Sequence, residues 1–176
     1  MFEHAGVRIR PIEERDLPAM VELRADPAVW TFLGDIEMIG LERQREWFRN
    51  LQHRIDRRYY ILGTKAHDFI GVVRTDEIDV TNRSMRVGGD ILPKYQGKGY
   101  GTRMFQLIRK YAFEYLNMNR LWLLVLENNK VALSLYRKAG FVEEGRQRKA
   151  IFRDGRYLDY LMMSILRSEH EKVTGR

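Results

Sequence analysis

A glycine-rich run of the chain has the residue types of an anion-binding loop. Residues 96–101 read Gln-Gly-Lys-Gly-Tyr-Gly. The three glycines allow backbone N–H groups to converge on one point without obstruction by a Cβ atom, and a helix beginning after them would direct the positive end of its dipole there. Lys98 and Arg103 add positive charge. The run predicts a cradle for a pyrophosphate.

Two established nucleotide-binding motifs fit this run less well. Its spacing differs from the G-x-x-x-x-G-K-[ST] of a P-loop. The run also lacks the preceding buried parallel strand, and the acidic residue about twenty positions later, of a dinucleotide-binding fold.

The hydrophobic pattern around the run predicts the elements that would position it. Alternation of period two predicts half-buried strands, and apolar stripes at helical spacing predict helices. A continuous apolar run, Leu121–Leu126, is typical of a strand covered on both faces. In order, we expect a strand at 7–12, helices at 17–25 and 41–53, strands at 58–64, 68–78 and 83–92, a helix at 101–117, a strand at 121–126, a helix at 129–138, and strands beginning at 141 and at 157 on either side of a hairpin turn at 153–156.

This order of elements predicts an α/β (α+β) fold with a mixed sheet flanked by about four helices. Because both connections after Leu92 pass through helices, we expect neighbouring strands to be parallel there. Residues 1–168 are expected to form a single domain, and residues 169–176 a frayed C-terminal tail.

The composition excludes several classes of protein. Of 176 residues, 44% are apolar and 31% charged, and none is cysteine, which is the profile of a globular domain without disulfides. Thiolate metal sites and thiol catalysis are excluded, and the four histidines are scattered, so we expect no bound metal. No stretch approaches the roughly 20 apolar residues of a membrane span, so a soluble, cytoplasmic protein is expected.

Positive charge is concentrated in the second half of the chain. Residues 1–92 contain 14 Lys and Arg against 16 Asp and Glu, whereas the remainder contains 17 against 8. Because a basic surface attracts polyanions, this asymmetry favours a phosphorylated cofactor or a nucleic acid as ligand. The sequence contains no helix-turn-helix, zinc knuckle or basic-aromatic ladder, which disfavours the nucleic acid.

Two segments together resemble the signature of a known enzyme family. Residues 96–101 are similar to the acetyl-CoA motif Q/R-x-x-G-x-G/A of the GNAT superfamily of N-acetyltransferases. Residues 129–141 resemble that family's N-x-x-A-x-x-L-Y-x-x-x-G-F element. Residues 23–27, 145–146 and 152–159 resemble the branch that contains ribosomal-protein N-terminal, spermidine and amino-sugar acetyltransferases.

The resemblance implies a GNAT-like fold, mostly antiparallel, with its sheet splayed between the fourth and fifth strands. Acetyl-CoA, the co-substrate, would enter at this splay. Asn129 would fix the pantetheine arm from one side, with Ala132 leaving room for it, although Asn129 also suits the N-cap of a helix. The backbone of Ile91 and Leu92 would bind the pantetheine from the other side, and the pyrophosphate would be held by Gln96, Gly97, Lys98, Gly99, Tyr100, Gly101 and Thr102.

The resemblance also implies direct transfer of the acetyl group to a primary amine in a ternary complex. Tyr136 is the expected general acid, because a phenol keeps its proton at neutral pH and can deliver it to a departing thiolate; alternatively, it only packs against the sheet. The N–H of Leu92 is the expected oxyanion donor. Glu127 and Asp90 are the candidate general bases, although carboxylates at strand ends are more often solvated or paired with arginine.

The acceptor site would be built by the N-terminal helices and the last hairpin, for a small-molecule or peptide amine. Basic side chains on the hairpin disfavour a free polyamine and favour a phosphate-bearing acceptor or a protein N-terminus on a ribonucleoprotein. These basic residues are Arg146, Arg148, Lys149, Arg153 and Arg156. The candidate wall residues, which also suit a core, are Trp30, Phe32, Trp47, Tyr59 and Tyr60.

Two alternatives to an enzyme remain at this point. A non-catalytic acyl-CoA-binding sensor would keep the cradle without turnover, and a basic nucleic-acid module would rest on the sequence pI of 9.7 alone. A homodimer built through the C-terminal strands is compatible with all three hypotheses, the enzyme, the sensor and the nucleic-acid module. No partner in a membrane is expected.

Overall fold

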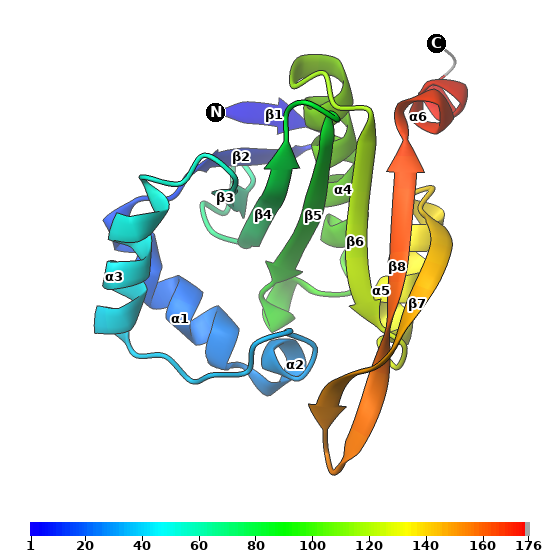
Figure 1. Cartoon of the computed structure of the whole chain (residues 1–176). Helices are drawn as coiled ribbons and strands as arrows, with labels where there is room; N and C mark the ends of the chain where they lie inside the picture. The colour runs from blue at the N-terminus through cyan, green and yellow to red at the C-terminus, as the bar shows by residue number, and fades with distance from the viewer. Residues whose placement is uncertain (175–176) are drawn as a thin grey trace.

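An eight-stranded sheet in the order β1-β2-β3-β4-β5-β6-β8-β7 forms the centre of the computed structural model, which describes residues 1–174 (Figure 1). Only β5 and β6 are parallel neighbours, so the predicted mixed, mostly antiparallel sheet is confirmed. The strands are β1 Phe2–His4, β2 Val7–Pro11, β3 Arg58–Gly63, β4 Gly71–Asp79, β5 Ser84–Ile91, β6 Arg120–Leu126, β7 Val142–Arg153 and β8 Arg156–Leu166.

Helices cover both faces of the sheet. The α-helices are α1 Leu17–Ala25, α2 Pro27–Trp30, α3 Leu41–Leu51, α4 Tyr100–Lys110, α5 Lys130–Lys138 and α6 Arg167–Thr174. A π-helical turn, Tyr111–Tyr115, extends α4. None of the helices in the described part of the chain is long and apolar enough to cross a membrane.

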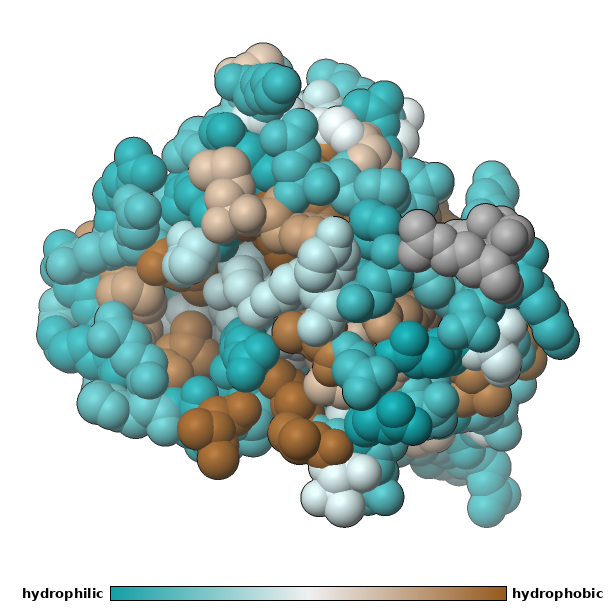
Figure 2. Space-filling view, turned by 90° about the horizontal axis from the view of Figure 1, so that it is seen from above, coloured by the Kyte–Doolittle hydropathy of each residue, from teal (hydrophilic) through white to brown (hydrophobic). Residues whose placement is uncertain are grey.

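The core is divided by the sheet into two clusters. Leu62 and Val73 point to the cluster beneath α4 and α5, whereas their neighbours Ile61 and Val72 point to the cluster beneath α1 and α3. This follows from the alternation of side chains along a strand. In Figure 1, α1 and α3 lie on one side of the sheet and α4 on the other. The surface seen in Figure 2 is mainly hydrophilic, with apolar groups in small separate patches.

The sheet splays between β5 and β6, which are the fourth and fifth strands of the predicted order. The two strands pair only from Ser84↔Arg120 to Arg86↔Trp122. Beyond that point β5 continues to Ile91 and β6 to Leu126 without pairing to each other. The predicted splay is therefore confirmed, and it opens at the strand end that precedes the glycine-rich run.

One expectation about strand neighbours is wrong. We expected parallel neighbours on both sides of the strand at 121–126, but β7 does not pair with β6. Instead β8 returns from the hairpin and inserts between them, pairing with β6 from Arg120↔Leu166 to Leu126↔Tyr160. The hairpin itself is as predicted, with positive φ at Asp154 and Gly155. The helical connection through α5 therefore does not make β7 the neighbour of β6, because the antiparallel strand β8 occupies that edge.

The C-terminal segment also differs from the expected frayed tail. Residues up to Thr174 lie in α6, and the remaining residues 175–176 lie outside the described part of the chain. His170 anchors this helix, because its ring stacks on Phe113 at a centroid distance of 5.0 Å and lies 3.0 Å from Arg109 Nη2. Only 6% of His170 is exposed.

Candidate active site

The glycine-rich run forms an open anion cradle at the start of α4. Gly97 and Gly99 have φ values of 71° and 81°, in the left-handed region that favours glycine, and a Cβ at either position would meet nothing within 4 Å. The first hydrogen bond into α4 runs from Arg103 N–H to the Gly99 carbonyl, 3.2 Å away. Within residues 1–174, no intramolecular acceptor is found for the N–H groups of residues 97–102. This row of N–H groups suits a diphosphate.

The third glycine of the run has a different role from the other two. A Cβ on Gly101 would lie 3.0 Å from Leu135 Cδ2, so this glycine lets α4 pack closely against α5. Lys98 and Thr102 are exposed beside the cradle, and the guanidinium of Arg103 lies 5.6 Å from the ring of Tyr100. Both cations belong to residues within or just after the glycine-rich run.

The end of β5 presents Ile91, rather than Leu92, to the splay. The N–H of Leu92 donates to the Ile70 carbonyl at 3.0 Å, so the expected use of this group as oxyanion donor is wrong. Because successive residues of a strand direct their backbone groups to opposite sides, the N–H and C=O of Ile91 face β6, where pairing has stopped. The Ile91 carbonyl accepts from Gln96 Nε2 at 2.9 Å, which ties the cradle to the strand.

Asn129 caps α5 in the structure. Its Oδ1 accepts from the N–H of Ala132 at 3.1 Å, so the helix-cap role weighed from the sequence is confirmed. This bond uses the amide oxygen. The amide nitrogen is then the group that a role toward pantetheine would require, so the two roles are compatible.

Tyr136 packs in the core beneath the splay. Its ring lies 5.1 Å from that of Phe105 and 6.1 Å from that of Phe141. Burial raises the pKa of Tyr136 to about 12, while the charge of Arg74 opposes this rise and that of Asp90 adds to it. The hydroxyl is therefore protonated at neutral pH, as a general acid must be. Its ring thus has the packing role weighed from the sequence, and its protonated hydroxyl meets one requirement of a general acid.

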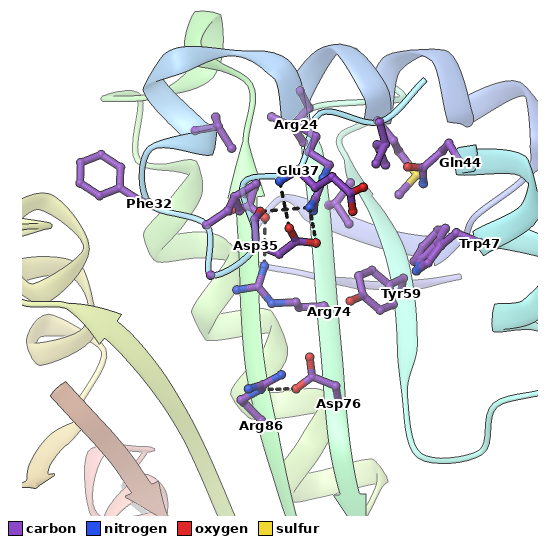
Figure 3. A pocket seen from close by; sticks show the side chains of 18 of the residues that line it. Arg24, Phe32, Asp35, Glu37, Gln44, Trp47, Tyr59, Arg74, Asp76 and Arg86 are labelled. Atoms are coloured by element: carbon purple, nitrogen blue, oxygen red, sulfur yellow. Dashed lines mark hydrogen bonds and ion pairs between the residues drawn. The ribbon is translucent and has the colours of Figure 1, made fainter. Parts of the chain in front are cut away.

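A pocket of about 510 Å³ lies on the opposite face of the sheet, over β3, β4 and β5 (Figure 3). Of the expected wall residues, Phe32, Trp47 and Tyr59 line it. Trp30 lines a smaller hollow, and Tyr60 packs near Tyr111 on the other face. The residues that line the 510 Å³ pocket are Met20, Leu23, Arg24, Val29, Phe32, Leu33, Gly34, Asp35, Glu37, Ile39, Arg43, Gln44, Trp47, Tyr59, Val72, Arg74, Asp76, Arg86, Val87, Asp90, Leu124 and Tyr160.

The structure brings one of the two candidate bases to this pocket. Asp90 lines it, with Oδ2 3.0 Å from Arg74 Nη1. Glu127 does not line it; its Oε2 lies 3.0 Å from Arg146 Nη1, and its Oε1 accepts from the N–H of Asp159 at 3.1 Å. The sequence did not distinguish these two strand-end carboxylates, because their partners come from distant segments.

The hairpin contributes contacts rather than a free basic surface at the pocket. Arg153 Nη2 donates to the carbonyls of Leu33 and Gly34, at 2.6 and 3.2 Å, and so holds the loop that forms one wall. Arg146 pairs with Glu127 and Asp159. The arginines that do line the pocket, including Arg74 on β4, were not singled out from the sequence.

The cradle, the splayed parallel strands and the adjoining pocket together define an acyltransferase that uses an acyl-CoA thioester. The chain belongs to the GNAT family, because the acetyltransferase (GNAT) domain model matches its residues 7–142. It is an acetyl-CoA-dependent N-acetyltransferase, as the resemblance implied. Among residues 1–174, no group of three or more His, Cys, Asp or Glu is placed to hold a metal ion.

Relatives with assigned activities cover nearly the whole chain. A spermidine N(1)-acetyltransferase of Vibrio cholerae is 28% identical over 167 residues, spanning 95% of this chain and 96% of the relative. That of Escherichia coli is 29% identical over 168 residues, spanning 94% and 88%. The crystal structure of the Vibrio cholerae enzyme in complex with CoA and spermine has a TM-score of 0.89 at 27% identity, covering 95% of this chain and 99% of that one.

Proposed function

We propose that this enzyme transfers the acetyl group directly to a primary amine held in the 510 Å³ pocket, with Tyr136 as general acid and Asp90 as proton acceptor. The observation that carries the proposal is the position of Asp90, which lines the pocket on the part of β5 that has diverged from β6. An ammonium must lose a proton before it can attack, and the departing thiolate must gain one.

The residues of the cradle fit acetyl-CoA, which supplies an activated acetyl thioester when bound. The N–H groups of residues 97–102 would bind its diphosphate, together with Lys98. The backbone of Ile91 and the amide nitrogen of Asn129 would bind the pantetheine from the two sides of the splay, next to Ala132. The N–H of Ile91 replaces that of Leu92 as our candidate oxyanion donor. No bound metal is required for these roles.

The acceptor classes suggested by the family differ in charge. The relatives' names support a polyamine as acceptor, whereas the sequence also left a protein N-terminus and a nucleotide-linked amino sugar open.

We further propose a cytoplasmic enzyme that forms a homodimer through β7, the exposed edge strand of the sheet.

The test of the proposed reaction is release of free CoA thiol from acetyl-CoA in the presence of amines, with mass spectrometry of each acetylated product. The amines would represent all three acceptor classes. Release that depends on the amine supports the proposal. Tight binding of acetyl-CoA with no release for any amine would instead support a non-catalytic sensor.

A further inference from the structure

The acceptor pocket contains as many arginines as carboxylates. Its four lining carboxylates are Asp35, Glu37, Asp76 and Asp90, and its four lining arginines are Arg24, Arg43, Arg74 and Arg86. Each carboxylate pairs with one of these arginines: Arg24 with Asp35 at 3.0 Å, Arg43 with Glu37, Arg74 with Asp90 at 3.0 Å, and Arg86 with Asp76. Figure 3 shows several of these side chains turned toward the same space. The lining is therefore balanced in charge.

Two of the arginines form the floor of the pocket. Arg74 is the register partner of Gly88, and Arg86 precedes Gly88 by two residues on the same face of β5. A Cβ on Gly88 would lie 2.9 Å from Arg74 Cζ, so the absence of a side chain there lets the guanidinium lie across the strand. The floor thus presents Arg86, Arg74 and then Asp90 in order toward the splay.

Both floor arginines keep donors that can bind an anion. Arg74 uses Nη1 for Asp90, and among residues 1–174 no hydrogen bond from its Nε or Nη2 is found. Arg86 uses Nε for Asp76 and Nη1 for Glu77. Burial alone would lower the pKa of Arg74, but the negative charges of Asp90 and Asp76 contribute to raising it above its ordinary value. Arg74 is therefore a permanent cation, whose fork geometry matches a carboxylate or a phosphate.

This arrangement is unfavourable for a free polyamine. Spermidine carries three positive charges and no anionic group, so each charge would have to displace an arginine from its carboxylate and leave that arginine without a counter-ion. It would also lie against four guanidinium groups of the same sign, and like-charge contacts are a common device for rejecting a ligand. An amine with an anionic group of its own would instead satisfy Asp90 and the floor arginines together.

We propose that the acceptor is a primary amine that also carries a carboxylate or a phosphate. Its amine would lie at Asp90 and its anionic group against Arg74 and Arg86. Two residues of strand separate the level of Gly88 from that of Asp90, so the two groups of the acceptor are separated by about 7 Å or less. The inference rests on the proposed function, since it narrows the substrate of that same pocket.

Matched pairs of amines test this inference. Ethanolamine is compared with O-phosphoethanolamine, and 1-aminobutane with 4-aminobutanoate, while spermidine represents the polyamines. We expect kcat/KM to be at least about tenfold higher for the anionic member of a pair, which corresponds to about 1.4 kcal/mol. The phosphate pair and the carboxylate pair show which anion is preferred. Preference for spermidine or for both plain amines would overturn the inference and leave the proposed reaction standing, whereas no turnover with any amine would overturn both.

Variants of the floor give a second test. In Arg74→Gln and Arg86→Gln, the ratio of kcat/KM for the anionic amine to kcat/KM for the plain amine should fall about tenfold or more. The double variant Arg74→Glu, Arg86→Glu should use spermidine better than the parent does. Arg49→Gln, an exposed arginine of α3 outside the pocket, is the matched control for loss of one positive charge. An unchanged ratio between anionic and plain amines in the floor variants would contradict the inference.

Discussion

The ring of Tyr136 lies edge-on to the ring of Phe105, 5.1 Å away, and this contact joins α5 to α4 beneath the splay. The contact uses the aromatic ring alone, so it separates the packing role of Tyr136 from the chemical role of its hydroxyl. Phenylalanine at position 136 would keep the ring and remove only the proton donor.

Tyr136→Phe should therefore fold normally and lose activity. We expect kcat to fall about 10²-fold or more, because general acid catalysis contributes on that scale, with the Kd for acetyl-CoA unchanged. Steady-state kinetics and calorimetry measure the two quantities. Unaltered kcat would assign Tyr136 to packing alone.

Gly99→Val should weaken binding of acetyl-CoA. A branched side chain at φ 81° strains the backbone and would occupy the open space of the cradle. Gly145→Val is the control, because a Cβ on Gly145 also meets nothing within 4 Å and its φ is not in the left-handed region. We expect the Kd measured by calorimetry to rise at least about tenfold for Gly99→Val only. Equal Kd values in the two variants would show that the cradle does not bind the diphosphate.

Substitution of the two candidate bases should separate them. Asp90→Asn should lower kcat/KM about 10²-fold near neutral pH, because the proton acceptor beside the pocket is lost. Glu127→Gln should change kcat/KM by less than about threefold, because Glu127 lies outside the pocket lining and pairs with Arg146. Profiles of kcat/KM against pH for both variants are the measurement. The reverse order of effects would transfer the role of base to Glu127.

Acidification should destabilise the docking of α6 through His170. Burial, together with the charge of Arg109, lowers the pKa of His170, although Glu114 and Glu171 oppose this. A folded-state pKa below the unfolded value means that the unfolded chain binds the proton more readily. The free energy of unfolding should thus fall as the pH drops below about 6.5. Urea unfolding of the parent and of His170→Gln, at several values of pH, measures this.

The variant provides the internal control for that measurement. His170→Gln should be about 1 kcal/mol less stable at pH 7.5, because the contacts of the ring are lost, and its stability should depend less on pH below 6.5. An equal dependence on pH in both proteins would place the responsible group elsewhere.

The cradle, the helix cap and the order of most elements could be predicted from the sequence, whereas β1, α2 and α6 could not. Glycines at 97 and 99, and an asparagine three residues before Ala132, act on backbone groups close to them in the chain, so their effects follow from local spacing. The two family motifs then predicted the splay and the acetyltransferase reaction, and both are confirmed.

Which groups are available for chemistry depends on contacts between segments that are distant in the chain. The N–H of Leu92 donates to Ile70, and Glu127 pairs with Arg146 outside the pocket lining, through strand pairing and a hairpin that bring together residues 19 or more positions apart. The balance of charge in the pocket likewise depends on the register that places Arg74 opposite Gly88. Such pairings are fixed by the packing of the whole sheet, because a shift of one residue would turn these side chains to the other face.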